Sequence, residues 1–421
     1  MNAPPQTDSL VRLLAPAGPS TTVSDLLTLP PATGTPFAAG PQATLAHLST
    51  LILQHPRLRA DAASVALAYW LRRSNLDRLA QAFERRRALE PETVFVPVGR
   101  VFHVAPGNVD TMFIYSWALS YLCGNQNIVR VSGQNSEVLA HLLSLLSSLM
   151  QENEELAAGN RFITYEHDQA VSAALSEWAT HRTVWGGDDT VKAFRALPMS
   201  PHASERAFAS KFSYSVLSAA TYLRASPLTA EKLAAGFFND LFWFDQLACS
   251  SPHLVIWAGS PEQSDSAIRR FDTELEKEIE RRGYESDPSH TMHRLNYVFN
   301  LSCDADLTVD LTQKQFLSVR LLDGHPWRKE ICGGGLFMHV RVENLADIAT
   351  IAEQRDQTVT HFGFSREELE LLAQAGGGRG VDRYVPIGDA LAFDVIWDGY
   401  DLVGDFLRRV TVRMGKYDSQ Q

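Results

Sequence analysis

The sequence has few cysteines, and their spacing would neither bind a metal nor build a disulfide framework. Its 421 residues contain four cysteines, which lie far apart at Cys123, Cys249, Cys303 and Cys332. There is no C-x-x-C pair, and no cysteine stands at a spacing from histidine that is typical of zinc sites. A disulfide-built fold is excluded because so long and cysteine-poor a chain relies on an apolar core. We therefore expect reduced thiols in the cytoplasm.

Positive charge and long apolar runs are also lacking. The net charge of −11 excludes broad binding to nucleic acids or anionic membranes, while a local basic pocket for phosphate stays compatible with it. No stretch reaches 18 uninterrupted apolar residues, so we expect no membrane span. Residues 1–20 have no basic region followed by an apolar core, so we expect no signal peptide.

The chain has ample apolar material for a large core, since 45% of its residues are hydrophobic. At roughly 100–200 residues per domain, its length predicts two or three domains. Residues 1–43 are rich in Pro, Ala, Thr and Gly and predict a flexible arm with one short helix at 24–29. Apolar residues at helical spacing then predict helices at 44–54 and 61–88.

Predicted strands and helices alternate from residue 93 onward, which indicates an α/β fold with a parallel sheet. Sheets of this kind bind ligands at the carboxyl ends of their strands, and these ends are predicted at 105–108, 132–136 and 186–189. At 186–189, the sequence G-G-D-D precedes a predicted helix at 190–196, with Asp188 and Asp189 as its expected caps. Residues 93–104 predict two strands joined by a tight turn.

A second α/β block is predicted beyond residue 240. Its expected elements are a strand at 254–257, a helix at 262–282, a polar loop at 284–291, strands near 296–301, 316–322 and 336–342, and a helix at about 345–355. The Gly-rich segment 374–379 predicts a flexible loop. Residues 407–414 alternate apolar and polar side chains, which predicts a half-exposed strand that offers an edge to another subunit.

Cys249 ends a strongly apolar run, F-W-F-D-Q-L-A-C at 242–249, and precedes a strand. From these residues alone it is either core filler, because cysteine is among the most buried residue types, or a nucleophile at a strand entrance. No Lys or Arg stands close in sequence, so any lowering of its pKa must come from backbone N–H groups or distant residues. His253, four residues on, is a candidate general acid or base, although a lone histidine entering a strand is more often structural.

Four patches in order resemble the aldehyde dehydrogenase superfamily: V-P-V-G with V-A-P-G-N at 96–108, G-N-Q-N-I-V-R-V-S at 124–132, Q-L-A-C at 246–249 and E-I-C-G-G at 330–334. Within that superfamily the chain is most similar to the acyl-CoA reductases of bacterial luminescence, the fatty-acid reductase type. The strings that carry this second likeness are H-V-A-P-G-N-V-D at 103–110, A-C-S-S-P at 248–252 and W-D-G-Y-D-L at 397–402.

The resemblance implies an aldehyde dehydrogenase-like α/β fold with a Rossmann-like cofactor domain, an α/β catalytic domain and a small oligomerisation strand region. On this basis we expect a flexible arm at 1–43 and a nucleotide-binding domain at 44–240 with an oligomerisation hairpin near 93–104. A catalytic domain at 241–395 follows. The segment 396–421 is expected to return to the nucleotide-binding and oligomerisation region. A homodimer or homotetramer is implied.

The resemblance makes Cys249 the nucleophile. Its thiolate would attack a fatty acyl-CoA or other acyl thioester, form an S-acyl-cysteine and, after reduction, release the aldehyde. Asn108 stands where the superfamily places the amide that donates to the oxyanion. From the residues alone, Asn108 is a turn asparagine.

The cofactor residues implied by the resemblance are Pro106, Arg130, Ser132, Gly186, Gly187 and Glu330. Arg130 stands where the superfamily usually has Lys, and Gly133 stands where many members that prefer NAD have Glu. An arginine without that carboxylate would suit a 2′-phosphate, so we expect NADPH to be preferred, with NADH possible. Glu330 matches the glutamate that holds the nicotinamide ribose. The sequence has no G-x-G-x-x-G, which the superfamily also lacks.

Hydrolytic members carry L-E-L-G-G-K, whose Glu activates water. The corresponding stretch here is 207–211, which has no Glu in place, although Glu205 is near. Its absence favours a reductase, since the acyl-enzyme is then protected from hydrolysis. The alternatives are an aldehyde dehydrogenase that makes acid or acyl-CoA, and a non-catalytic subunit of an acyl-transfer complex. The resemblance also implies an acyl-activating or acyl-transferring protein partner.

Overall fold

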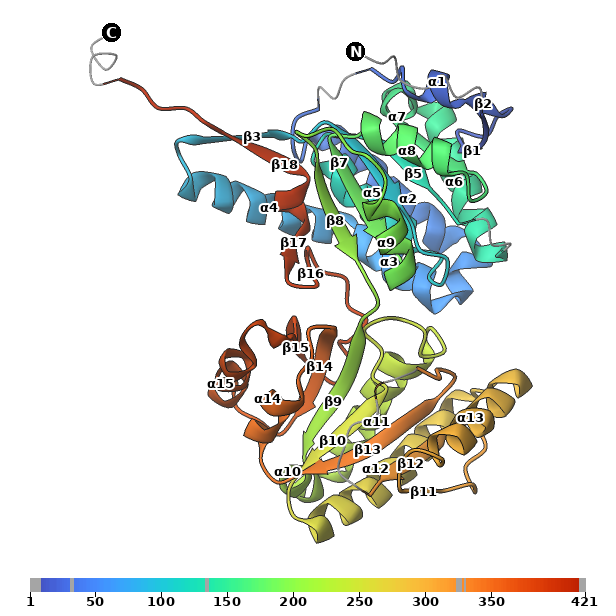
Figure 1. The fold of residues 1–421 in the computed structure, drawn as a ribbon, viewed down its shortest axis with the longest axis vertical. Coiled ribbons are helices and arrows are strands. Elements are labelled where there is room, and N and C mark those ends of the chain that lie inside the picture. The colour runs from blue at the N-terminus through green and yellow to red at the C-terminus, as the bar shows by residue number, and fades with distance from the viewer. Residues whose placement is uncertain (1–8, 31–33, 133–135, 323–327, 329–330, 416–421) are drawn as a thin grey trace. The chain divides into compact units, whose positions relative to one another are not determined.

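The computed structural model describes residues 9–30, 34–132, 136–322, 328 and 331–415. The chain divides into two compact units, one formed by Met1–Ala209 with Phe393–Gln421 and the other by Ser210–Ala392. Each unit contains a seven-stranded sheet (Figure 1). The first boundary lies earlier than the predicted 240/241, because α11 (Pro227–Phe242) packs within the second unit. The C-terminal segment contributes a strand, Leu407–Thr411, that pairs with Thr93–Pro97 of the first unit.

The sheet of the first unit has the order β2-β1-β6-β5-β4-β7-β8. Its strands are β2 (Thr21–Thr22), β1 (Leu10–Ala15), β6 (Asn160–Thr164), β5 (Gln126–Arg130), β4 (Arg100–Val104), β7 (His181–Trp185) and β8 (Ser204–Phe208). The five strands from β6 to β8 are parallel, which confirms the prediction of a parallel α/β sheet. The carboxyl ends of β4, β5 and β7 therefore meet at one edge.

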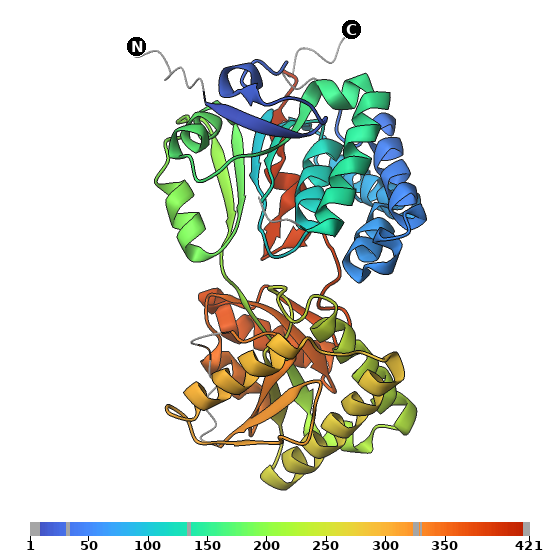
Figure 2. The ribbon, with the colours of Figure 1, turned by 90° about the vertical axis from the view of Figure 1, so that its right-hand side faces the viewer.

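Helices cover both faces of this sheet (Figure 2). One core lies under α2 (Ala39–Gln54), α3 (Ala62–Leu71), α4 (Arg73–Leu89), α5 (Met112–Leu122) and α6 (Glu137–Glu152). The other lies under α1 (Val23–Leu26), α8 (Gln169–Trp178) and α9 (Asp188–Arg195), and α7 (Glu154–Gly159) leads into β6. The single helix predicted at 61–88 is two helices, since Arg72 adopts an extended conformation with ψ 150° between α3 and α4.

The prediction of a flexible arm at 1–43 is wrong for its described residues. Leu10–Ala15 forms β1, which pairs antiparallel with β6 and so adds a strand to the sheet. Val11 and Ala15 are buried there, with 1% and 0% of their surface exposed. The partner strand is about 150 residues away in the sequence, so the local pattern of residues 10–15 could not reveal the pairing.

The hairpin predicted at 93–104 is also wrong, because its two strands do not pair with each other. β3 (Thr93–Pro97) pairs antiparallel with β18 (Leu407–Thr411), whereas β4 runs between β5 and β7. Residues 101–104 are all buried, which suits a central parallel strand covered on both faces. The strand predicted at 407–414 exists as β18, and its partner within the chain is β3.

The sheet of the second unit has the order β11-β12-β13-β10-β9-β14-β15. Its strands are β11 (Leu307–Val309), β12 (Leu317–Leu321), β13 (Leu336–Val342), β10 (Leu254–Ala258), β9 (Phe212–Ser218), β14 (Asp356–Phe362) and β15 (Arg383–Pro386). All neighbours are parallel except β11. α10 (Ala219–Arg224), α11 and α12 (Pro261–Arg282) cover one face. α13 (Pro288–Leu301), α14 (Ile348–Ile351) and α15 (Arg366–Gly376) contribute to the core on the other.

The strand predicted near 296–301 and the second half of the loop predicted at 284–291 are wrong, since α13 spans 288–301. Asp287 caps this helix by accepting from the Ser289 N–H, and Pro288 occupies its first position. The buried residues Arg294, Tyr297, Val298 and Leu301 recur at helical spacing. The helix predicted at 345–355 is a short turn, Leu345–Asp347, followed by α14, and the Gly-rich segment 374–379 ends α15 and forms a further turn, Gly377–Arg379.

The C-terminal part of the first unit adds β16 (Ile396–Trp397), β17 (Tyr400–Asp401) and α16 (Leu402–Asp405). Among the described residues, no helix combines the length and apolarity that crossing a bilayer requires.

Candidate active site

Cys249 lies in the loop between α11 and β10, and its side chain is exposed. Its neighbours Ala248, Ser250 and Ser251 are buried. The Ser251 N–H donates to the Ala248 carbonyl at 2.9 Å and closes a turn around the cysteine. The Ser213 hydroxyl donates to the Cys249 carbonyl at 2.7 Å and ties this turn to β9. The interpretation of Cys249 as core filler is therefore wrong, because the residue is exposed.

The other cysteines differ from Cys249. Cys123 is fully buried, and burial raises its pKa far above the usual range. Cys332 is partly buried, and burial raises its pKa to about 11, so its thiol stays protonated at neutral pH. Cys303 is exposed at the end of α13. All four cysteines lie in the described part of the chain, and none of them forms a disulfide there.

The loop of Cys249 lies against a glycine loop, defined here as Gly333–Gly335, which leads into β13. The Gly334 N–H donates to the Asp245 carbonyl at 2.8 Å. Both loops precede parallel strands that pair with each other, β10 and β13, so they meet at the amino-terminal edge of the second sheet. Part of the E-I-C-G-G string is thus brought next to the Q-L-A-C string, as their shared resemblance would require.

His253 is buried, with 4% of its surface exposed, beside the ring of Phe212. Burial lowers its pKa to about 4, so the imidazole is neutral at pH 7. This environment favours the structural interpretation over the role of a general acid.

Replacing His253 by phenylalanine should therefore change stability and leave activity almost intact. The folded pKa of about 4 lies below the ordinary 6.5, so the unfolded state binds the extra proton and stability falls as pH drops through that window. Between pH 6.5 and 4, the free energy of unfolding should fall by about 2–3 kcal/mol less for His253→Phe than for the wild type. Urea unfolding at several pH values measures this. A hundredfold fall in aldehyde formation at pH 7 would instead assign His253 to the chemistry.

Glu205, the carboxylate nearest to the stretch where hydrolytic relatives activate water, is engaged elsewhere. It lies on β8 and accepts from Arg182 Nε at 2.7 Å and from Arg195 Nε at 3.3 Å. Arg182 is almost fully buried, so this ion pair anchors β7 to β8 within the first unit. An acid held in this way is a structural partner of arginine.

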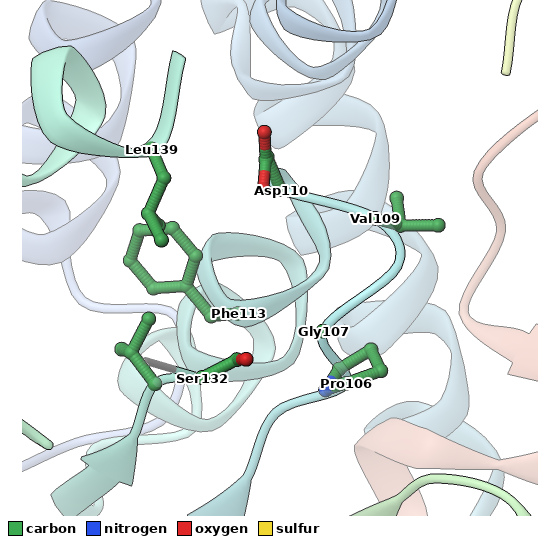
Figure 3. A pocket seen from close by; sticks show the side chains of 8 residues that line it. Pro106, Gly107, Val109, Asp110, Phe113, Ser132 and Leu139 are labelled. Atoms are coloured by element: carbon green, nitrogen blue, oxygen red, sulfur yellow. The ribbon is translucent and has the colours of Figure 1, made fainter. Parts of the chain in front are cut away.

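A small pocket lies at the carboxyl ends of β4 and β5 (Figure 3), and its lining residues are Pro106, Gly107, Val109, Asp110, Phe113, Val131, Ser132 and Leu139. Pro106 and Ser132, which were predicted from separate strings, therefore share one pocket. Asn108 lies in the same loop after β4, and its side chain is exposed. The Ser136 hydroxyl donates to the Asp110 carboxylate, which links this loop to the start of α6. Asp110 was not predicted, although it ends the string H-V-A-P-G-N-V-D.

Arg130 ends β5 beside this pocket. Its guanidinium lies over the ring of Tyr165, with its carbon 4.7 Å from the ring centroid. Its Nε is buried, and in the described part of the chain it has no hydrogen-bond partner. Gly133, where many relatives carry a glutamate, lies outside the described residues.

Gly186 and Gly187 follow β7 at the same edge of the first sheet. Gly187 is the N-cap of α9, and Asp188 and Asp189 occupy its first turn, so the expectation that these aspartates cap the helix is wrong. A side chain at Gly186 would meet Thr190 at 2.9 Å, which explains the small residue. Two carboxylates in the first turn stabilise the helix, because they interact favourably with the positive end of its dipole. Their negative charge disfavours a phosphate at the same place.

Glu330 lies outside the described residues. Arg328, two positions earlier, is buried and pairs with the buried Asp356. In the part of the chain that the structure describes, no cluster of three or more metal-ligating side chains occurs.

The sequence profile of the acyl-CoA reductase (LuxC) family matches residues 46–291, which is more than half of the chain and includes both the β4–β5 pocket and Cys249. The chain belongs to this family. It is 28% identical over 166 residues to a long-chain acyl-protein thioester reductase of Vibrio harveyi and 26% identical over 190 residues to that of Aliivibrio fischeri. These matches cover 39% and 44% of this chain but 33% and 36% of the relatives, so the chain spans about a third of their length.

Among solved structures, the LuxC-family chain is similar to aldehyde dehydrogenase 21 of Physcomitrella patens, with a TM-score of 0.65, 12% identity, and 90% of this chain and 86% of that one covered. It is also similar to methylmalonate-semialdehyde dehydrogenase of Oceanimonas doudoroffii, with a TM-score of 0.63, 13% identity, and 93% and 90% covered. At these identities the likeness shows the fold, which confirms the predicted aldehyde dehydrogenase-like architecture.

Proposed function

We propose that this protein reduces acyl thioesters to aldehydes, with Cys249 as the residue that carries the acyl group. The observation that supports this most is the exposed Cys249 thiol within the segment that matches the family profile. The relatives named above are thioester reductases by name, and the fold is that of aldehyde dehydrogenases. The ion pairs of Glu205 also support a reductase, because they withdraw the nearest candidate for a water-activating base.

The proposed first step is acyl transfer. The Cys249 thiolate attacks the carbonyl carbon of the thioester, a new C–S bond forms, and the donor thiol leaves with the proton that Cys249 has lost. One thioester replaces another, so the step needs no external energy source. A reduced nicotinamide nucleotide, when bound, would supply the hydride that brings the acyl carbon to the oxidation level of the aldehyde. Breaking the bond to the Cys249 sulfur then releases the aldehyde.

The acyl donor is proposed to be a fatty acyl-CoA or an acyl group on a protein thioester. The names of the curated relatives favour the protein-bound donor, and the name of the family favours the CoA ester. A panel of acyl-CoA and acyl-protein thioesters of increasing chain length, each with NADPH or NADH, tests the proposal by aldehyde formation. The absence of aldehyde from every donor would reject it.

We propose the pocket at the ends of β4 and β5 as the place where the adenosine end of a nicotinamide nucleotide binds. It presents the Ser132 hydroxyl and the Asp110 carboxylate. Arg130 ends the strand that leads into it, and among the described residues its buried Nε has no hydrogen-bond partner. Pro106, Arg130 and Ser132 would hold the nucleotide, with Glu330 proposed at the nicotinamide ribose. Gly186 and Gly187 are also proposed as cofactor residues, and the aspartates in the first turn of α9 make a phosphate the less favourable ligand for them.

The guanidinium of Arg130 is proposed to bind the 2′-phosphate of NADPH and so to make NADPH the preferred hydride donor. Replacing Arg130 by glutamine should lower the ratio of kcat/KM for NADPH to that for NADH about tenfold or more, since a hydrogen bond between charged groups contributes about 1.5–3 kcal/mol. Initial rates with both nucleotides measure this ratio. A wild-type enzyme that prefers NADH would contradict the proposal and would assign the Asp110 carboxylate to the ribose hydroxyls.

Asn108 is proposed to donate its side-chain amide to the oxyanion that forms at the acyl carbon. The Asn108→Ala variant should lower kcat about 100-fold while KM for the acyl donor stays within threefold, because the oxyanion exists only near the transition state. Steady-state kinetics measures both constants. A variant whose kcat stays within twofold of the wild type would remove Asn108 from the mechanism.

We also propose a cytoplasmic homodimer or homotetramer, and an acyl-activating or acyl-transferring protein as partner. The two-stranded sheet of β3 and β18 supports the oligomer, since β18 is largely exposed. Light scattering on the purified protein tests its size. A monomer at all accessible concentrations would reject the oligomer.

A further inference from the structure

The turn that precedes Cys249 is strained. Asp245 and Gln246 both adopt positive φ values, 47° and 62°. A residue with a side chain loses roughly 1–2 kcal/mol in this left-handed region, so two in succession persist only where their surroundings fix them. Three residues later the chain reaches Cys249. The conformation of this turn therefore determines the position and direction of the backbone at Cys249.

The side chain of Gln246 fixes the turn from inside the protein. The residue is fully buried. Its Nε2 donates to the carbonyls of Pro252 and Leu336, both at 2.8 Å. Its Oε1 accepts from the Gly335 N–H at 3.0 Å. One amide thus spans the two ends of the Cys249 loop and joins them to the start of β13, with its donors and its acceptor all used.

Arg294 of α13 fixes the glycine loop from the other side. Its Nη1 donates to the Gly334 carbonyl at 2.6 Å and the Gln315 carbonyl at 2.8 Å. Its Nη2 donates to the Lys314 carbonyl at 3.1 Å. The guanidinium is 1% exposed, and none of its hydrogen-bond partners among the described residues is a carboxylate. A buried cation without an anionic partner is unfavourable by itself. Its presence here therefore indicates that the Arg294 guanidinium is needed to hold the backbone of the glycine loop and does more than fill space.

The contacts of Gln246 and Arg294 converge on the glycine loop. The backbone of Gly334 is held by both of its polar groups, because its N–H donates to the Asp245 carbonyl while its C=O accepts from Arg294. Tyr284 adds a hydrogen bond from its hydroxyl to Asp245 Oδ1 at 3.0 Å. Gly335 leaves no room for adjustment, since a side chain there would meet the Phe242 ring at 2.9 Å. The strained turn, the glycine loop and α13 are thereby locked to one another.

We infer that Gln246 and Arg294 are positioning residues for Cys249, and we call the pair the clamp. The inference rests on the proposed function, in which Cys249 attacks an acyl carbon. Cys249 is exposed and its backbone belongs to this loop, so the direction from which its sulfur approaches a substrate depends on the conformation of the loop. Catalytic geometry must be held within about 0.5 Å, and a shift of about 1 Å can lower a rate about 100-fold. The clamp supplies that restraint from buried side chains that do not touch the substrate.

Gln246→Met tests the clamp, because methionine has a similar length and forms none of the three hydrogen bonds. Gln374→Met is the matched control, since Gln374 is exposed on α15 of the same unit. Acylation of Cys249 by an acyl-CoA should slow about 100-fold in Gln246→Met. KM for the donor and nucleotide affinity should stay within threefold. The alkylation of Cys249 by iodoacetamide, which needs an accessible thiolate but no aligned thioester, should also stay within threefold. The control should match the wild type in every measurement.

Arg294→Lys is the second variant, since lysine keeps the charge and loses the fork that reaches several carbonyls at once. Folding of both variants is checked by circular dichroism. A folded variant that is acylated within twofold of the wild-type rate overturns the inference. Alkylation that slows together with acylation also overturns it, because the thiol itself would then be buried. If neither variant folds, Gln246 and Arg294 are needed for the folding of the whole second unit, and this result contradicts a positioning role. If wild-type Cys249 is alkylated but never acylated, the proposed function fails instead.

Discussion

Replacing Cys249 by alanine is expected to lower the rate of aldehyde formation by about 10⁴-fold or more, the scale seen when a covalent nucleophile is removed. The exposed turn between α11 and β10 would remain, because the Ser213 hydroxyl bonds to the backbone carbonyl of residue 249 and not to its side chain. The variant should therefore fold and bind nucleotide like the wild type. Measured aldehyde formation from acyl-CoA or acyl-protein with NADPH gives the ratio.

Cys303→Ala is the matched control for this experiment. Cys303 is also an exposed cysteine of the second unit, but it lies at the end of α13 and contacts the Phe299 carbonyl. Its removal should leave the rate within twofold of the wild type. Equal losses in the two variants would point to a general effect of cysteine removal. An active Cys249→Ala enzyme would remove Cys249 from the mechanism.

Asp356→Ala is expected to destabilise the second unit by about 3–5 kcal/mol. Asp356 is completely buried and forms an ion pair with Arg328, of which 3% is exposed. The Arg328 guanidinium lies over the rings of Phe212 and Tyr214, at 5.1 and 5.2 Å from their centroids. Without the carboxylate, a cation would remain buried among aromatic rings, and the Glu353 N–H would lose its acceptor.

Glu370→Ala is the control, since Glu370 pairs with Arg366 on the exposed face of α15. Surface pairs of this kind contribute roughly 0.3–0.5 kcal/mol. Urea unfolding of both variants measures the difference. A loss below about 1 kcal/mol in Asp356→Ala would show that Arg328 finds another partner or reaches water, and that the pair is not a main support of the unit.

Periodicity allowed the first sheet to be predicted where strands and helices alternate locally, as from β4 through α5 to β5. It failed where partners lie far apart in sequence. β1 pairs with β6, and β3 pairs with β18, so neither pairing leaves a local signal. α13 was missed because its buried face includes the charged Arg294, which a hydrophobic pattern counts as surface. The sequence Asp287-Pro288, a capped start with proline at the first position, was the available signal.

The site followed the same division. Pro106 and Ser132, which the resemblance to the superfamily assigned to the cofactor, line one pocket. The local sequence of Cys249 favoured burial, because most of the residues from Phe242 to Ala248 are apolar. That pattern could not reveal that the turn leaves Cys249 itself exposed. Asp110 and Arg294 act through residues distant in sequence, Ser136 and Gly334, so their contacts required the fold. The role of Gln246 was hidden for the same reason, although it stands in the Q-L-A-C string.

The most direct test of the central claim is to locate the acyl group on the protein. The wild-type enzyme is incubated with a long-chain acyl thioester in the absence of nicotinamide nucleotide, digested at low pH and mapped by mass spectrometry. We expect one acyl group per chain, on the peptide that contains Cys249, and its disappearance with release of aldehyde when NADPH is added. An acyl group on another residue, or aldehyde formation without any adduct at Cys249, would contradict the account.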